Sequence, residues 1–473
     1  MRAKKRTRIT RTLTDVCLLL AVGTHLAQEP AAPPPTPPPP VPEKPAAQPA
    51  VEPAPILDPA VHLETTSPPP ALPQTPSPQM ESITLFPDSA EQPIPSFQED
   101  TKWHFVLHGS ARGTFDSNIF ITHDRPEEDF YFTVAAGIAV GRGDFRSEIF
   151  DLGSFRDRFV RDRSEIVKDK SYFFLNYIPS YTVFLNNSGE NTFDHDLAFE
   201  GQWVIQKLKL GAQARFQTDN IPDQDLGERI ERRLFNTALT SLYDYSDKTS
   251  VELNARFSIR DYVPSDKIDV DELRFETWLN YQILPKIALS AGGAYGHVTV
   301  SKGPDQDYWQ GLLRVRYKAT EKFQLQASAG VEFRDTGLFG TQTNPVFSIG
   351  ASYVATDSTS IYLTAYGRTQ TSSSSAGTNY TLTGIEAQLR QRFLHRLYVV
   401  LAGGFQHSEY DSGAAATGPD RTDDSFYIRP AIGIDISKRC SAEASLEYRN
   451  VDSNIDKRTY DRLLVYLQFN VLF

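Results

Sequence analysis

The stretch "RLLVYLQFNVLF", residues 462–473, decides how the rest of the chain is interpreted. Every second residue counted back from the end is apolar: Phe473, Val471, Phe469, Leu467, Val465 and Leu463. The residues between them are mostly polar. Because side chains alternate between the two faces of a β-strand, this period of two predicts a strand with one apolar and one polar face.

The same alternation recurs from residue 102 to the end of the chain. Clear examples are "FQLQASAGVEFR" (323–334), "CSAEASLEYR" (440–449) and "FYIRPAIGIDI" (426–436). Repeats of this kind predict about 18 strands of roughly 10 residues. Their expected centres lie near residues 109, 135, 177, 199, 212, 239, 256, 276, 291, 313, 328, 350, 364, 386, 402, 431, 445 and 466.

The connections between these segments alternate between tight turns and longer polar loops. Tight turns are predicted near residues 207, 285, 321, 358, 395 and 439, and polar loops at 217–231, 334–345, 369–379 and 407–424. Short turns at one end and long loops at the other are typical of outer-membrane barrels. Residues 141–170 are too long for the turn expected there, so we predict an insertion, with a helix or hidden strands as the alternatives.

The apolar face of each strand needs lipid or a core to cover it. The sequence has no run of about 18 apolar residues, so a transmembrane helix is not predicted. In lipid every backbone amide needs an internal partner, and closed sheets meet this need. We therefore predict an all-β fold, a transmembrane antiparallel up-and-down β-barrel of about 18 strands.

Two segments are expected before the barrel, which should span residues 102–473. A basic stretch followed by a short apolar one predicts a signal peptide over residues 1–27. Residues 28–101 are rich in proline and alanine, and 23 of the 32 prolines of the chain lie before residue 100. This composition predicts a disordered periplasmic spacer, or a segment that binds peptidoglycan.

The final strand resembles the C-terminal strand of bacterial outer-membrane barrels, which ends in Phe after alternating apolar residues. In that group the strand is a signal for the barrel-assembly machinery. The matching residues here are Phe473, Val471, Phe469, Leu467 and Val465. The resemblance implies an outer-membrane location, with outer-membrane lipid, lipopolysaccharide and the assembly machinery as partners.

A narrower resemblance lies in "GTFDSNIFIT" (113–122) and "YFFLNYIPSYTVFLNN" (172–187). These stretches are similar to the β-barrel porin 2 family of Gram-negative bacteria, and the similarity is expected to cover residues 100–473. Some members of that family accompany exopolysaccharide export systems. The long 141–170 segment departs from the family pattern.

The polar faces of the predicted strands carry many charges that would line a pore. These are Arg256, Arg260, Arg314, Arg316, Arg334, Arg368, Arg390, Arg392, Arg429, Arg449, Arg462, Glu252, Glu332, Glu386, Glu443 and Glu447. One interpretation is a selectivity field, in which the arginine excess favours anions or acidic sugars. The other is a hydrated wall of paired charges that hold neighbouring strands in register.

The expected function is that of a porin-like channel for passive diffusion of small hydrophilic solutes. The alternatives are a conduit for exopolysaccharide export and a non-conducting structural or adhesive barrel tethered to the cell wall. No enzymatic activity is predicted, because the histidines of "FDHD" (193–196) and "THDR" (122–125) lie in no catalytic motif and are expected in loops. No metal site, cofactor or nucleic-acid partner is predicted either.

Overall fold

The computed structural model describes residues 103–143, 171–264, 266–320, 322–337, 340–375, 377–394, 396–411, 421–437 and 439–473. The predicted signal peptide, the proline-rich segment and nearly all of the predicted 141–170 insertion lie outside these residues. Residues 141–143, at the start of that insertion, continue a strand instead.

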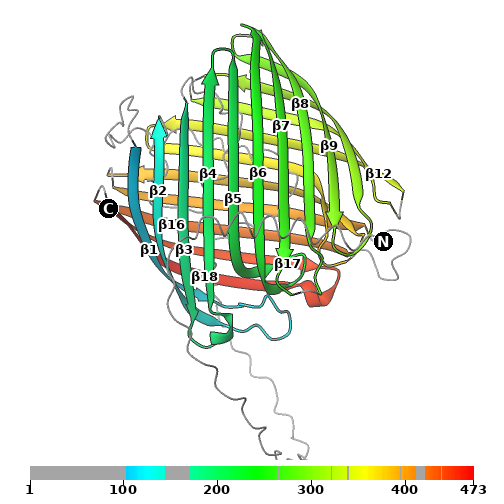
Figure 1. Cartoon of the computed structure of the whole chain (residues 1–473). Helices are drawn as coiled ribbons and strands as arrows, with labels where there is room; N and C mark the ends of the chain where they lie inside the picture. The colour runs from blue at the N-terminus through cyan, green and yellow to red at the C-terminus, as the bar shows by residue number, and fades with distance from the viewer. Residues whose placement is uncertain are drawn as a thin grey trace, which may run out of the picture. The chain divides into compact units, whose positions relative to one another are not determined.

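The described residues form a single closed sheet of 18 antiparallel strands (Figure 1). Each strand pairs with its neighbours in sequence, and β1 also pairs with β18, which closes the ring. The strands are β1 (Trp103–Asp116), β2 (Asp129–Gly143), β3 (Tyr172–Phe184), β4 (Thr192–Ile205), β5 (Leu208–Asp223), β6 (Glu228–Ser246), β7 (Thr249–Tyr262), β8 (Val270–Leu284), β9 (Ile287–Val300), β10 (Gln306–Lys318), β11 (Phe323–Asp335), β12 (Thr341–Thr356), β13 (Thr359–Thr371), β14 (Asn379–Phe393), β15 (Leu397–Asp411), β16 (Arg421–Ser437), β17 (Cys440–Ser453) and β18 (Tyr460–Leu472).

The predicted antiparallel up-and-down barrel is confirmed. Each of the 18 expected centres falls within a different strand. Two local predictions are wrong. Residues 217–231 are not a loop, because β5 and β6 continue through most of them and leave only residues 224–227 between the strands. His195 lies within β4, where its Nδ1 is 2.8 Å from the Tyr177 hydroxyl, and not in a loop.

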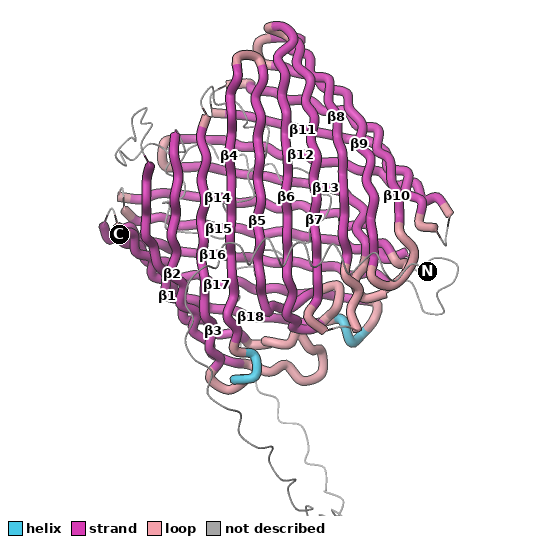
Figure 2. The backbone as a smooth tube through the Cα atoms, viewed as in Figure 1, coloured by secondary structure: helices cyan, strands magenta, loops and turns pink. Residues whose placement is uncertain are grey.

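The two ends of the barrel differ in their connections. At the turn end, strands are joined at residues 206–207, 247–248, 285–286, 319–322, 357–358, 394–396 and 438–439. At the loop end the connections are longer, and two of them contain the 3₁₀ turns η3 (Ser188–Glu190) and η4 (Asp456–Arg458). Figure 2 shows these two turns in cyan among the loops at one end of an otherwise strand-rich tube.

The outer face of the barrel is apolar. Val465, Leu467 and Phe469 of β18 point outward and are 39%, 50% and 51% exposed, and Phe473 is 71% exposed. Similar exposed side chains occur on strands all around the ring, among them Phe105, Trp309 and Ile432. The apolar side of the alternating pattern is therefore the outer surface, and the polar side lines the interior.

Inner aromatic rings fill the space above glycines on neighbouring strands. A Cβ added at Gly433 would lie 2.1 Å from the ring of Tyr398, and one at Gly296 would lie 2.0 Å from the ring of Tyr308. Both glycines are paired directly opposite these tyrosines. Aromatic packing over a cross-strand glycine pins the register of the two strands, because a shift by one residue would break the fit.

Candidate functional site

All sixteen charged residues predicted to line a pore lie on the inner face of the barrel. Each alternates along its strand with outward residues; Arg390, for example, lies next to the exposed Leu389, and Arg429 next to the exposed Ile428. Their placement follows from the strand period and the observed register. Their role in lining a pore remains a prediction.

Most of the inner arginines with a defined partner are bound to a carboxylate. Four ion pairs join residues two apart on one strand: Arg274–Glu276, Arg334–Glu332, Arg421–Asp423 and Arg449–Glu447. Such pairs cannot hold neighbouring strands in register, because both partners belong to the same strand.

Other ion pairs do connect strands. Arg314 on β10 lies 2.7 Å from Glu252 on β7, and Arg392 on β14 lies 2.7 Å from Asp435 on β16. Arg462 closes the seam between β18 and β1 through Asp116, with Nη2 and Oδ2 2.6 Å apart. The inner wall therefore combines pairs within strands with pairs between strands.

Tyrosines connect the inner charges to one another. The guanidinium of Arg334 lies 4.5 Å from the ring centre of Tyr308, whose hydroxyl donates a hydrogen bond to Glu272. At the turn end Arg390 lies 4.8 Å from the Tyr398 ring, whose hydroxyl donates to Glu443 at 2.9 Å. Arg–Tyr–Glu contacts of this kind orient the charges of the wall.

The tip of the β5–β6 hairpin contacts the far wall of the ring. Its Asp225 accepts hydrogen bonds from Ser372 Oγ at 2.8 Å and from the backbone N–H of Ser373 at 2.7 Å. Arg421 at the start of β16 donates to the carbonyl oxygens of Asp225 and Gln224, at 2.8 and 2.9 Å. Because β13 and β16 lie nearly opposite β5 and β6 in the ring, the hairpin must reach across the loop end.

Buried charges hold the hairpin in this position. Arg232 bonds Asp219 at 2.8 Å and Asp223 at 3.1 Å, and the Tyr262 hydroxyl donates to Asp223 at 3.1 Å. At the tip, Gly227 has a positive φ of 68° and no side chain, and the Arg458 guanidinium packs against it. Burial and the neighbouring Arg421 lower the pKa of Arg458.

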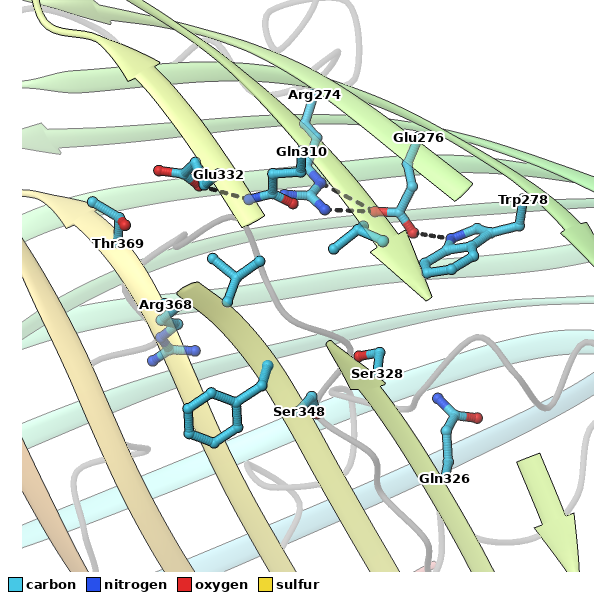
Figure 3. Close-up of a pocket in the computed structure, with 13 residues that line it drawn as sticks. Arg274, Glu276, Trp278, Gln310, Gln326, Ser328, Glu332, Ser348, Arg368 and Thr369 are labelled. Carbon is cyan, nitrogen blue, oxygen red and sulfur yellow. Dashed lines mark hydrogen bonds and ion pairs between the residues drawn. The ribbon is translucent and has the colours of Figure 1, made fainter. Parts of the chain in front are cut away.

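An open cavity lies along the inner wall between β8 and β13. On one side its polar groups are bonded to each other: Arg274 to Glu276, Glu276 to Trp278, and Gln310 to Glu332 (Figure 3).

Arg368 differs from the other cations of this cavity. Its guanidinium lies 4.9 Å from the ring centre of Tyr366 and makes no ion pair with a described carboxylate. Figure 3 shows it on the opposite side of the cavity from the bonded groups. A cation without a carboxylate partner, beside Ser348 and Thr369, can attract an anion and donate hydrogen bonds to it.

Several residues of this arrangement were missed by sequence reasoning. Asp116, Asp219, Asp223 and Asp225 are buried acceptors at the loop end, and none was expected to be functional. One signal that could have found some of them is the apolar pair Ile230 and Leu234 on one face of the strand, with the charged Glu231 and Arg233 on the other face. This alternation continues β6 back into the presumed loop.

Within the described ranges, no cluster of His, Cys, Asp or Glu has the geometry to hold a metal ion. Among the same residues, no helix is long and apolar enough to cross a membrane.

Comparison with known proteins gives only architectural similarity. No family model and no curated protein matches the chain. Similar solved structures include three from Pseudomonas aeruginosa. The outer membrane protein opdK has 9% identity over 78% of this chain and 99% of its own, with a TM-score of 0.42. OccK2 (OpdF) in complex with glucuronate has 11% identity over 78% and 98%, with a TM-score of 0.41. The siderophore receptor PirA has 10% identity over 78% and 80%, with a TM-score of 0.38. At this level the similarity adds nothing to the topology described above.

Proposed function

We propose that this protein is an outer-membrane channel through which small hydrophilic solutes diffuse. The observation that carries the proposal is the contrast between an apolar outer face and a charged inner face on a closed 18-stranded ring. A closed barrel satisfies its backbone hydrogen bonds internally, as lipid requires. Rings of 16 to 18 strands are wide enough for an aqueous channel.

The orientation follows from the connections. In barrels of this class short turns face the periplasm and long loops face outward. β1 starts at the turn end and β18 finishes there, where the Phe473 N–H donates to the Leu107 carbonyl at 2.8 Å. The proline-rich segment before β1 would then lie in the periplasm, where peptidoglycan is its proposed partner. The proposed partners in assembly are the barrel-assembly machinery and outer-membrane lipids, including lipopolysaccharide.

The inner wall supports preferential passage of anions. Arg368 projects a charge into the cavity that no described carboxylate neutralises, whereas Arg274 and Glu332 are already bonded.

Membership of the β-barrel porin 2 family, based on residues 113–122 and 172–187, is also part of this proposal, and so is a transport role in place of an enzymatic one.

Planar-bilayer recording of the purified protein tests the channel. Insertion should produce discrete conductance steps in potassium chloride. In a salt gradient, the reversal potential should have the sign expected for an anion-selective channel. A folded wild type that never conducts would overturn the proposal, whether or not a variant without residues 224–227 conducts.

A non-conducting barrel is the second candidate, because specific contacts favour it. The hairpin tip is bonded to the far wall, and inner residues near it such as Arg334 and Asp423 are 1% and 0% exposed. Under this alternative the wild type is silent and only the tip-deleted variant conducts. An exopolysaccharide conduit would instead conduct and be blocked by acidic oligosaccharides.

A further inference from the structure

The tight turns share one backbone arrangement. In each, the carbonyl oxygen of the last turn residue accepts a hydrogen bond from the next hairpin along the ring. Examples are Lys207 O from Asp244 N at 2.8 Å, Lys248 O from Gln282 N at 2.7 Å, and Arg396 O from Asp435 N at 2.8 Å. This position is therefore fixed by the sheet at each of seven turns between β4 and β17.

A basic residue occupies this position in six of the seven turns. The six are Lys207, Lys248, Lys286, Lys322, Arg396 and Arg439, and Ser358 takes the seventh position. We call these six residues the basic rim. All six are exposed, and none forms an ion pair with a described acidic residue. The Nζ atoms of Lys207, Lys286 and Lys322 instead reach carbonyl oxygens of the neighbouring hairpin, at 3.5, 2.6 and 3.4 Å.

Few acidic residues lie near the basic rim in the part of the chain that the structure describes. Asp247 and Asp357 are the acidic residues among the described residues of these turns. Two further carboxylates nearby are already paired, Asp244 with Lys209 at 3.9 Å and Asp435 with Arg392 at 2.7 Å. The described turns therefore carry an excess of positive charge, although the whole chain has a net charge of -11.

The basic rim lies directly beyond the edge of the apolar outer face. Ile205, Tyr245, Leu284, Leu394 and Ile436 are 58%, 70%, 53%, 87% and 50% exposed, and each precedes a basic-rim residue by two or three positions. If the apolar face lies in hydrocarbon, the first charged groups past its edge lie at the depth of lipid headgroups.

We propose that the basic rim binds the phosphate groups of anionic phospholipids in the leaflet at the turn end. This inference relies on the membrane location in the proposed function. Successive hairpins place the charges roughly 10 Å apart around the ring, two strand spacings each. Lipid surrounds a barrel on every side and can reach all six positions, whereas a single docked protein would reach one sector. Each cation near an anionic surface adds to the attraction.

Lipid-dependent stability tests this proposal. The full-length chain is folded into phosphatidylcholine vesicles with and without phosphatidylglycerol, and urea unfolding is followed by tryptophan fluorescence. The test variant combines Lys248→Gln, Arg396→Gln and Arg439→Gln, whose side chains form no hydrogen bond with the described residues. The control combines three exposed loop-end changes, Arg125→Gln, Lys302→Gln and Lys457→Gln. Because Lys302 also donates a hydrogen bond to the Asp266 carbonyl at 2.6 Å, the comparison uses the gain from phosphatidylglycerol and not the absolute urea midpoint.

The wild type should unfold at a higher urea midpoint when phosphatidylglycerol is present, and high salt should abolish the difference. The rim variant should lose roughly half of this gain, because three of six charges are removed, and the loop-end control should keep it. A full gain in the rim variant, or no gain in the wild type, would overturn the proposal. Bilayer conductance of each variant is a separate readout. If the protein conducts but its urea midpoint does not depend on phosphatidylglycerol, only the basic-rim proposal is overturned. If it never conducts but its urea midpoint does depend on phosphatidylglycerol, only the proposed function is overturned.

Discussion

Several charged inner side chains at the loop end are fully buried, whereas those near the tight turns remain partly exposed. Arg232 and Arg334 are 0% and 1% exposed and are held by several partners each. Arg316 and Arg392, near the tight turns, retain partial contact with solvent. The same residue type therefore stabilises packing at one end and borders an open interior at the other.

The two ends also differ in the charge of their connections. The described loop-end connections contain nine acidic residues and five basic ones, while the described turns contain six basic residues and two acidic ones. The loop end is held together by side-chain hydrogen bonds and ion pairs between segments that are distant in sequence. The turn end is held together by a repeated backbone hydrogen bond, which fixes the position of one exposed side chain per hairpin.

The largest effect should come from removing Arg232. Arg232→Met leaves Asp219 and Asp223 buried without their partner, which should cost about 3–5 kcal/mol. The hairpin should then lose its fixed position, and limited proteolysis of the folded barrel should cut at residues 224–227. The matched turn-end control is Arg392→Met, whose partner Asp435 stays hydrated, so its cost should be below about 1 kcal/mol. Equal losses of unfolding free energy in the two variants would show that the ion pairs of the two ends do not differ in their contribution to stability.

A smaller effect is expected from the hairpin tip itself. Asp225→Asn removes the charge that faces Ser372, Ser373 and Arg421, and hydrogen bonds to a charged group contribute about 1.5–3 kcal/mol. The tip should detach more often, so single-channel recording should show larger or more frequent conductance steps than in the wild type. Asp247→Asn at the turn end is the control and should leave the records unchanged. A tip variant with wild-type conductance would show that the hairpin does not restrict the pathway.

Packing of the inner wall at the turn end can be tested at Gly433. A valine there would overlap the Tyr398 ring, and overpacking of this kind costs about 1–3 kcal/mol. Gly311→Val is the matched control, because a Cβ at Gly311 has no atom within 4 Å. Urea unfolding in vesicles should show a lower midpoint for Gly433→Val alone. If both variants unfold like the wild type, ring packing over glycine does not stabilise the turn end.

Much of the fold was predictable because the deciding signal is local. A period of two is present within each strand, and turn residues mark its limits, so the positions of all 18 strands follow from short stretches of sequence. The inner placement of Arg314 or Glu447 follows from the same alternation. Pairs two residues apart, such as Arg449 and Glu447, are also visible in the sequence.

The loop-end arrangement was not predictable in the same way. Asp225 and Ser372 are separated by 147 positions, and their contact depends on how the closed ring brings opposite strands together. Residues 217–231 are rich in polar side chains, which favoured a loop, although bonds from Arg232 and Tyr262 allow these carboxylates to be buried in strands. Contacts with residues that are distant in sequence thus allow this polar segment to form strands, although its composition favours a loop.

The smallest effect is expected at Arg368. Because it has no carboxylate partner among the described residues, Arg368→Gln should change the free energy of unfolding by less than about 0.5 kcal/mol. The loss of one charge in the cavity should lower the anion-to-cation permeability ratio by roughly twofold, measured from the reversal potential in a salt gradient.

Arg368→Lys keeps the charge in the same cavity and separates electrostatics from shape. It should retain the wild-type reversal potential if Arg368 acts as a point charge, since an ammonium attracts anions as well. A shift as large as that of Arg368→Gln would instead indicate that the planar guanidinium, held over the Tyr366 ring, forms paired hydrogen bonds with a carboxylate. If Arg368→Gln has the same reversal potential as the wild type, the cavity does not lie on the ion pathway. Any anion selectivity must then come from the partly exposed arginines nearer the turns.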